Sequence, residues 1–193
     1  TQYTCLYHTE VEYIKDIRRM HALQDVEIVT DISEVTEAIP EIPLYTDAYT
    51  LALRYSLASL LEKTLSKRAY LKSGAYLVIE PTEAMTVIDV NSGKSIKGKN
   101  AEEQFLKINI EAAKEIARQL RLRNISGIVM IDFINMKEDT HNQELVKRLA
   151  EFVRTDPVRT TVVDMTKLGL VELTRQKGKR ALHEVFSENN RLT

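Results

Sequence analysis

The sequence predicts an α/β fold, in which a mixed β-sheet carries flanking helices. Three observations in the second half of the chain lead to this prediction. Residues 75–80 and 84–90 are strand-like, and Pro81 and Thr82 between them indicate a turn, as in a hairpin. Apolar residues recur every three or four positions over residues 101–123, as on one side of a long helix. Residues 127–131 are continuously apolar, which is typical of a strand inside a sheet.

Length and composition indicate a folded protein with a real core. The chain has 193 residues, of which 44% are hydrophobic and 28% charged. Its apolar runs fall short of the roughly 20 residues that span a bilayer, and its N-terminal residues do not resemble a secretion signal. We therefore expect no membrane span and a cytoplasmic location. Cys5 is the only cysteine, so no internal disulfide and no cysteine-based zinc site is expected in this chain.

Charge is distributed unevenly along the chain. Residues 1–66 contain 11 acidic and 5 basic side chains, a balance of −6, and residues 67–193 contain 17 acidic and 22 basic side chains, a balance of +5; the sum is the net charge of −1. This asymmetry predicts two structural units, and it indicates that the second one meets a polyanion.

The first unit is predicted to be mainly helical. Residues 11–23 have the apolar spacing of an amphipathic helix, and residues 26–30 alternate like a short strand. Asp31 is placed to cap a turn of helix that ends before Pro40. A further helical pattern begins at Asp47 and continues to Leu65, after which we place the boundary of the unit, at residue 66.

The second unit, residues 67–185, is predicted to alternate strands and helices. A hairpin over residues 75–90 is followed by a polar loop, and then by the helix at 101–123, which Asn100 and Glu103 are placed to cap. The apolar strand at 127–131 is expected to lie centrally in the sheet. A helix at 139–153, strands at 160–163 and 168–173, and a polar tail at 186–193 complete the prediction.

Two acids and an amide follow the apolar runs of this unit. Asp89 and Asn91 are two residues apart, so they point to the same face of a strand, and Asp132 closes the next apolar run. A helical connection between parallel strands would bring both acids to one edge of the sheet. Carboxylate and amide oxygens suit Mg²⁺, or Mn²⁺, better than Zn²⁺.

A structural role explains each acid taken alone, because many carboxylates only cap strand ends or helices. Two acids that each close an apolar run favour a functional site, since charge is costly to hold there without a partner. The residues alone leave both interpretations open.

Basic residues surround these acids in the sequence. Each of them taken singly is typical of a solvated face, but together with a metal site they indicate a phosphodiester substrate, whose phosphates they would contact. The candidates for this phosphate-binding role are Lys94, Lys97, Lys99, Arg121, Arg123, Lys167, Arg175 and Lys177. The nearby aromatic residues are expected to be mostly core, so no base stacking is assigned to them.

Three longer runs resemble a known family. They are YLKSGAYLVIEPTEAMTVIDVNSGK, AEEQFLKINIEAAKEIARQLRLRNISGIVMIDFINM and KLGLVELTRQK, and they are similar to the catalytic region of the bacterial ribonuclease E/G endoribonucleases. The resemblance is dense from about Lys67 to Lys179 and weaker over YIKDIRRMHALQDVEIVTD.

This resemblance implies a DNase I-like catalytic subdomain, preceded by the closing part of an RNase H-like subdomain. It implies that Asp89 and Asp132 bind Mg²⁺, that Asn91 supports them, and that Lys167, Arg175 and Lys177 line the path of the RNA. The implied reaction is hydrolysis of single-stranded, A/U-rich RNA to 5′-phosphate and 3′-hydroxyl ends. Leu168 stands where the family often has phenylalanine, so no stacking role is expected of it.

Parts that flank this region in the family have no counterpart in the sequence. They are the OB-fold RNA-binding domain, the pocket that senses a 5′-monophosphate, and the CPxCxG zinc link that joins subunits. We therefore expect a fragment or a short member of the family, and a homo-oligomer is expected for the full-length protein. An alternative function follows, namely a non-catalytic RNA-binding or assembly module.

Overall fold

The computed structural model describes residues 14–15, 17–18, 27–93 and 100–189, and its internal contacts divide the chain into two compact units. The first unit is Thr1–Leu60 and the second is Leu61–Thr193. Asp89, Asn91 and Asp132 all belong to the second unit. Each unit is described by itself below.

The described part of the first unit is held by one small apolar cluster. Its buried members are Ile14, Val35, Ile39 and Ile42. The helices are α2 (Ser33–Ala38), α3 (Leu51–Arg54) and the first residues of α4 (Leu57–Leu65). Residues 14–15 and 17–18 are helical, as predicted for 11–23, and the remaining residues of that prediction lie outside the described part of the chain.

Three details predicted for this unit are wrong. Instead of a strand at 26–30, the described residues 27–30 make one isolated β-bridge, Thr30 to Leu44. Helix α2 begins at Ser33 without a side-chain cap from Asp31. The helical stretch expected from Asp47 begins at Leu51, where Thr50 caps it, and it breaks at Ser56, whose φ of 51° is left-handed.

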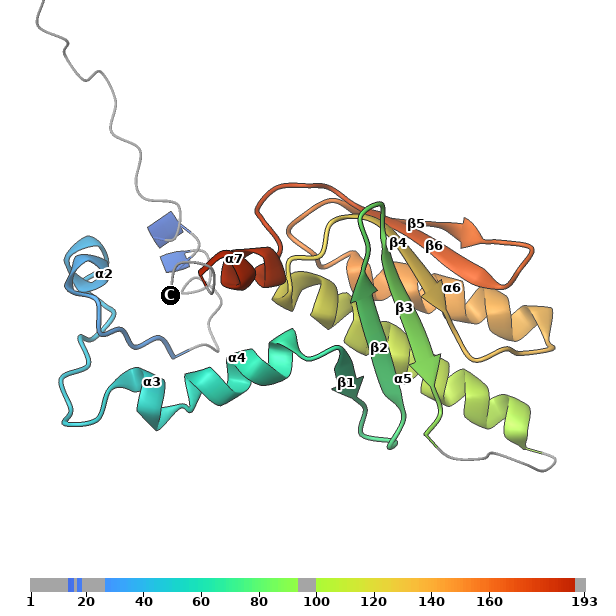
Figure 1. Cartoon of the computed structure of the whole chain (residues 1–193), viewed down its shortest axis with the longest axis horizontal. Helices are drawn as coiled ribbons and strands as arrows, with labels where there is room; N and C mark the ends of the chain where they lie inside the picture. Colours follow the sequence, from blue (N-terminus) through green and yellow to red (C-terminus); the bar gives the residue numbers. More distant parts are fainter. Residues whose placement is uncertain (1–13, 16, 19–26, 94–99, 190–193) are drawn as a thin grey trace, which may run out of the picture. The chain divides into compact units, whose positions relative to one another are not determined.

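The second unit contains a mixed sheet whose six strands, among the described residues, lie in the order β1-β2-β3-β4-β6-β5 (Figure 1). Only β3 and β4 are parallel neighbours; the other pairs are antiparallel. The strands are β1 (Arg68–Tyr70), β2 (Tyr76–Pro81), β3 (Thr86–Asn91), β4 (Gly127–Asp132), β5 (Thr160–Met165) and β6 (Leu170–Arg175). The predicted hairpin is therefore confirmed as β2 and β3.

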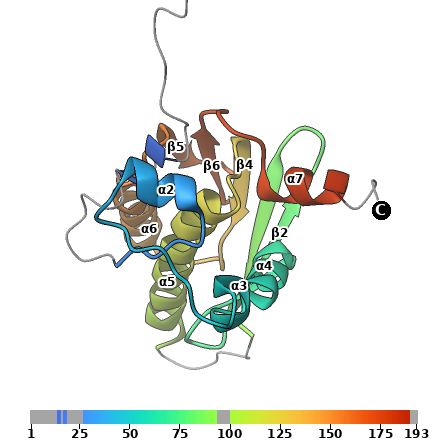
Figure 2. The same ribbon diagram turned by 90° about the vertical axis from the view of Figure 1, so that its left-hand side faces the viewer.

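Two long helices cover one face of this sheet. α5 (Ala101–Leu122) connects β3 to β4, and α6 (Asp139–Val153) connects β4 to β5. Both lie on the same side of the sheet (Figure 2), and their buried residues form one apolar cluster with alternate residues of the strands. None of the described helices combines the length and the hydrophobicity that crossing a membrane requires.

The other face of the sheet carries the alternate residues, which are largely in contact with solvent. In β4 only Val129 and Ile131 are buried, whereas Ile128 is 48% exposed. The central position predicted for 127–131 is confirmed, but its burial on both faces is not, because the helices cover one face only. We call this second surface the open face.

Two further expectations for this unit need correction. Asn100 makes no side-chain cap bond to α5, and Glu102 instead accepts hydrogen bonds from the backbone N–H groups of Lys137 and Glu138, at 2.6 and 3.0 Å. These bonds lower the pKa of the Glu102 carboxyl. The polar tail expected from residue 186 is in part helical, because α7 spans Leu182–Asn189.

Candidate functional site

Asp89 and Asp132 meet at one end of the sheet. β3 and β4 run parallel, and their register places Asp89 directly beside Asp132. Neighbouring strands lie roughly 4.8 Å apart, so the two backbones bring the carboxylates within reach of one common ion. The helix α5 lies between β3 and β4 in the sequence and provides the crossover connection that parallel strands need, as the sequence predicts.

Both acids stand on the open face. Along β3 the residues Thr86, Ile88 and Val90 point to the helices, which leaves Asp89 exposed and Asn91 half-buried on the opposite face. Asp132 is also exposed. The argument that charge is costly at these positions does not hold, since solvent reaches both acids. What still favours a functional site is that Asp89 and Asp132 lie side by side at the same end of the sheet.

Asn91 lies beside Asp89 on the same face of β3, as their spacing predicts. Its Nδ2 donates a hydrogen bond of 2.7 Å to Oδ2 of Asp89. An amide that donates to one carboxylate oxygen fixes the rotamer of the acid and leaves the other oxygen to bind a ligand. Asn91 is therefore a positioning residue for Asp89.

The donor set fits a hard divalent cation. In the part of the chain that the structure describes, no group of three or more His, Cys, Asp or Glu side chains is placed to hold a metal. Mg²⁺ does not require one, because it is commonly held by one or two carboxylates while water and substrate phosphates complete its shell. Asp89 and Asp132 match that pattern, and a site for Zn²⁺ would need nitrogen or sulfur ligands.

Gly93 closes the turn that follows Asn91. Its φ is +68°, and a Cβ at this position would collide with the backbone carbonyl oxygen of Gly74. The glycine of the motif thus lets the chain leave β3 close to the neighbouring turn.

Gly93→Ala is expected to destabilise the second unit by more than about 1 kcal/mol, since the left-handed backbone alone costs a residue with a Cβ roughly that much. Urea unfolding measures the loss. Gly178→Ala is the matched control, because a Cβ there meets nothing within 4 Å. Equal stability of the two variants would contradict this role for Gly93.

Asn109 is a supporting residue that sequence reasoning missed. It is fully buried on α5, where its Nδ2 donates to the carbonyl of Ile134 at 2.8 Å and its Oδ1 accepts from the N–H of Ile134 at 3.0 Å. The pair of bonds fixes the backbone two residues after Asp132. A polar residue on the apolar side of a predicted helix was the available signal.

Asn109→Leu is expected to lower the free energy of unfolding by about 2 kcal/mol, because both backbone groups of Ile134 lose their partner. It should also speed hydrogen exchange at the Ile134 amide. Gln104→Ala, at an exposed position of the same helix, should change stability by less than about 0.5 kcal/mol. An unchanged exchange rate at Ile134 would show that Asn109 does not hold this segment.

The predicted RNA-binding residues are not all at this end of the sheet. Lys167 is exposed in the turn between β5 and β6, three residues before Leu170, which pairs with Asp132. By contrast, Arg121 lies in the last turn of α5 and Arg123 caps the end of this helix, so both precede β4 at the opposite end of that strand. Five residues of strand, roughly 16 Å, separate Gly127 there from Asp132. Lys94, Lys97 and Lys99 lie outside the described residues.

Arg175 has a structural role in place of the predicted one. Its side chain is 3% exposed and forms an ion pair of 2.8 Å with Asp156, whose side chain is 1% exposed. It also donates to Asn124 Oδ1 and to the Ile125 carbonyl, both at 3.0 Å. Every one of these bonds joins β6 to the loops around it, so Arg175 is not available to RNA.

Arg123 is also largely buried, with 8% of its surface exposed. Its Nε donates to Gln119 at 2.6 Å, and its carbonyl accepts from the N–H of Leu182. Burial lowers the pKa of the Arg123 guanidinium. These contacts hold the end of α5 and connect it to α7. The Arg123 side chain is therefore not accessible to RNA.

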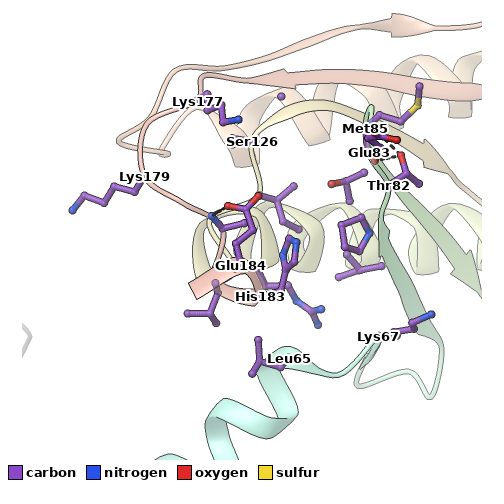
Figure 3. Close-up of a pocket in the computed structure, with 18 of the residues that line it drawn as sticks. Leu65, Lys67, Thr82, Glu83, Met85, Ser126, Lys177, Lys179, His183 and Glu184 are labelled. Atoms are coloured by element: carbon purple, nitrogen blue, oxygen red, sulfur yellow. Dashed lines mark hydrogen bonds between the residues drawn. The ribbon is translucent and has the colours of Figure 1, made fainter. Parts of the chain in front are cut away.

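A cavity of about 400 Å³ lies at this opposite end of the sheet. Figure 3 shows the side chains that surround it, which come from the end of α4 and the residues after it, the hairpin turn, the start of β4 and the segment around α7. Its labelled lining includes Lys67, Thr82, Met85, Lys177, His183 and Glu184. Lys177, predicted to bind RNA, thus belongs to this cavity, and the two acids do not.

Comparison with known proteins identifies similar sequences. The Ribonuclease E/G family model matches residues 6–178. The chain is 40% identical over 163 residues to Ribonuclease G of Haemophilus influenzae, which covers 82% of this chain and 33% of that protein. It is 41% identical over 147 residues to Ribonuclease E of Synechocystis sp., covering 76% and 22%. Ribonuclease G of Escherichia coli K12 is 37% identical over 155 residues, covering 78% and 32%. The chain thus spans a third or less of the length of these relatives.

Proposed function

This chain belongs to the ribonuclease E/G family, and we propose that it carries the metal-dependent site of an endoribonuclease that cleaves single-stranded RNA. The observation that supports the proposal is the register of β3 and β4, which sets Asp89 beside Asp132 on an accessible face. Two such acids, from strands far apart in sequence, are a recurrent arrangement for hydrolysis of phosphodiesters.

The chain's own residues would each do one part of the work. Asp89 and Asp132 hold Mg²⁺, and Asn91 keeps Asp89 oriented through its 2.7 Å hydrogen bond. The bound ion supplies a Lewis acid, which lowers the pKa of water and stabilises negative charge that develops on the phosphate. Lys167 contacts a backbone phosphate from the neighbouring turn. Attack of water on phosphorus, with the 3′-oxygen as the leaving group, would break the P–O3′ bond and leave a 5′-phosphate and a 3′-hydroxyl.

The finer assignments belong to the same proposal. They are the DNase I-like character of the second unit, the RNase H-like origin of the first, the preference for A/U-rich RNA, and action in the cytoplasm. Mg²⁺ is the proposed ion, and Mn²⁺ has the same preference for oxygen ligands.

The test is cleavage of end-labelled single-stranded RNA by the chain, with Mg²⁺ and with an excess of chelator. The expected products have 3′-hydroxyl ends, which a ligase joins to an adaptor without prior treatment, and an A/U-rich RNA is cut faster than a G/C-rich one. Products with 2′,3′-cyclic phosphate ends, or cleavage that persists with chelator, would overturn the proposal.

A second function has its own support. Because the chain spans a third or less of its relatives, it corresponds to a non-catalytic RNA-binding or assembly module if the other parts of those proteins are needed for cleavage. Salt-dependent RNA binding without cleavage, at saturating Mg²⁺, is the result that would distinguish this function from the first.

A further inference from the structure

Two tyrosines and an arginine form a cluster on the open face of the sheet. The ring centres of Tyr70 and Tyr76 lie 5.9 Å apart, with their planes tilted by 49°. The guanidinium of Arg68 lies 5.2 Å from the centre of the Tyr76 ring. Tyr70 is 71% exposed and Tyr76 is half-buried. The sequence predicted mostly core positions for the aromatic residues here, and for Tyr70 this is wrong.

The strand register places this cluster beside the two acids. Tyr70 pairs with Tyr76, and Tyr76 pairs with Asn91, which is bonded to Asp89. The next row along the same strands holds Arg68, Val78, Asp89 and Asp132. β1, β2 and β3 lie side by side (Figure 1), so the cluster and the acids form one continuous surface. Tyr70 stands two strands from Asn91, roughly 10 Å.

The cluster is not explained by packing of the sheet. Ala69 and Leu77, its neighbours in sequence, point to the helices and belong to the main apolar cluster, which contains neither tyrosine. An exposed cation–π contact such as that of Arg68 with Tyr76 contributes little to stability. Apart from its tilted ring contact with Tyr76, Tyr70 therefore presents a flat aromatic surface to solvent.

We propose that Tyr70 and Tyr76 form a stacking platform for one unpaired base of the RNA, held next to the scissile phosphate, with Arg68 contacting the adjoining phosphate. Bases of single-stranded RNA stack on exposed aromatic rings, whereas the bases of a duplex are already stacked on each other. The platform would thus select for single strands at the site itself. This inference rests on the proposed function, and it assigns the substrate contact that the acids alone do not provide.

The test uses Tyr70→Ala and a short single-stranded RNA in which one nucleotide at a time is replaced by an abasic residue. Binding is measured by fluorescence anisotropy in Ca²⁺, so that RNA is not consumed. With intact RNA, Tyr70→Ala should weaken binding about 5- to 150-fold, the usual cost of losing one stacked base. With the abasic residue at the stacked position, wild type and variant should bind equally.

Two controls separate stacking from other effects. Tyr70→Phe keeps the ring and should bind like wild type. Tyr49→Ala removes a tyrosine of the same exposure, 72%, from the first unit and should leave binding unchanged. Circular dichroism of each variant confirms that it is folded, which the exposure of Tyr70 predicts.

Several results would overturn the inference. They are equal binding of Tyr70→Ala and wild type to intact RNA, an equal loss for every abasic RNA, or an equal loss in Tyr49→Ala. If Mg²⁺-dependent cleavage persists alongside such a result, the platform is wrong and the proposed function stands. If wild type cleaves no RNA but the abasic pattern is observed, the platform stands and the nuclease proposal fails.

Discussion

Asp132→Asn is expected to lower the rate of RNA cleavage at least about 100-fold, because a divalent ion contributes several kcal/mol of charge stabilisation and every 1.36 kcal/mol is a factor of ten in rate. Asp89→Asn should have a similar effect, since both carboxylates converge on one position. The double variant should be little slower than either single one, because residues that act as a unit are not additive. Single-turnover kinetics at saturating enzyme measure all three.

Asp164→Asn is the matched control for this prediction. Asp164 is an exposed carboxylate of β5, two strands from Asp132 in the sheet order, and its removal should leave the rate within about twofold. Cleavage that survives Asp89→Asn and Asp132→Asn would contradict the assignment of the site. So would an equal loss in Asp164→Asn, which would indicate a general effect of charge.

Arg175→Met is expected to destabilise the protein by about 3–5 kcal/mol, because it leaves Asp156 buried without its partner. Replacing both partners by apolar residues, Arg175→Met with Asp156→Leu, should be less harmful than Arg175→Met alone. Urea unfolding at neutral pH measures these differences. Lys67→Gln removes one partner of an exposed ion pair, Lys67 with Glu80, and should cost less than about 1 kcal/mol.

The ion pair also predicts how stability depends on pH. Burial acts to raise the pKa of Asp156, but hydrogen bonds from Arg175 and from the Val158 N–H outweigh it and hold the pKa below its ordinary value. Its contribution is therefore complete above the ordinary pKa of an aspartate, about 3.9, and is lost as the pH falls through the lower pKa of the folded state. Asp156→Asn should remove this part of the acid dependence. A variant Arg175→Met that weakens RNA binding but leaves stability unchanged would contradict the structural role of Arg175.

The parallel pair of strands could be predicted from the sequence because its signals are local. An apolar run, a long amphipathic helix and a second apolar run leave few topologies, and the acids follow directly from where each run ends. The helix predicted at 139–153 has those bounds in the structure, α6 (Asp139–Val153). Both elements depend on periodicity, which is read without knowledge of tertiary contacts.

Other features depend on contacts that no sequence window contains. Glu102 binds the start of α6 and not its own helix, because Lys137 and Glu138 present their N–H groups to it. Arginine is a residue type that often contacts RNA phosphates, and only the ion pair with Asp156 in the structure shows that Arg175 is buried. The strand β1, which contains Tyr70, has only three residues and was not predicted; its pairing with β2, Tyr70 to Tyr76, places Tyr70 on the face away from the helices.

The most direct test of the site is the position at which a paramagnetic divalent ion binds. Small amounts of Mn²⁺, added to isotope-labelled protein, broaden the amide signals of residues close to the bound ion. We expect the strongest broadening at the ends of β3 and β4, around Asp89 and Asp132, and its loss in Asp89→Asn and in Asp132→Asn. Broadening centred on the acidic first unit, or at the strand ends in both variants as in wild type, would contradict the metal site on which the proposed function depends.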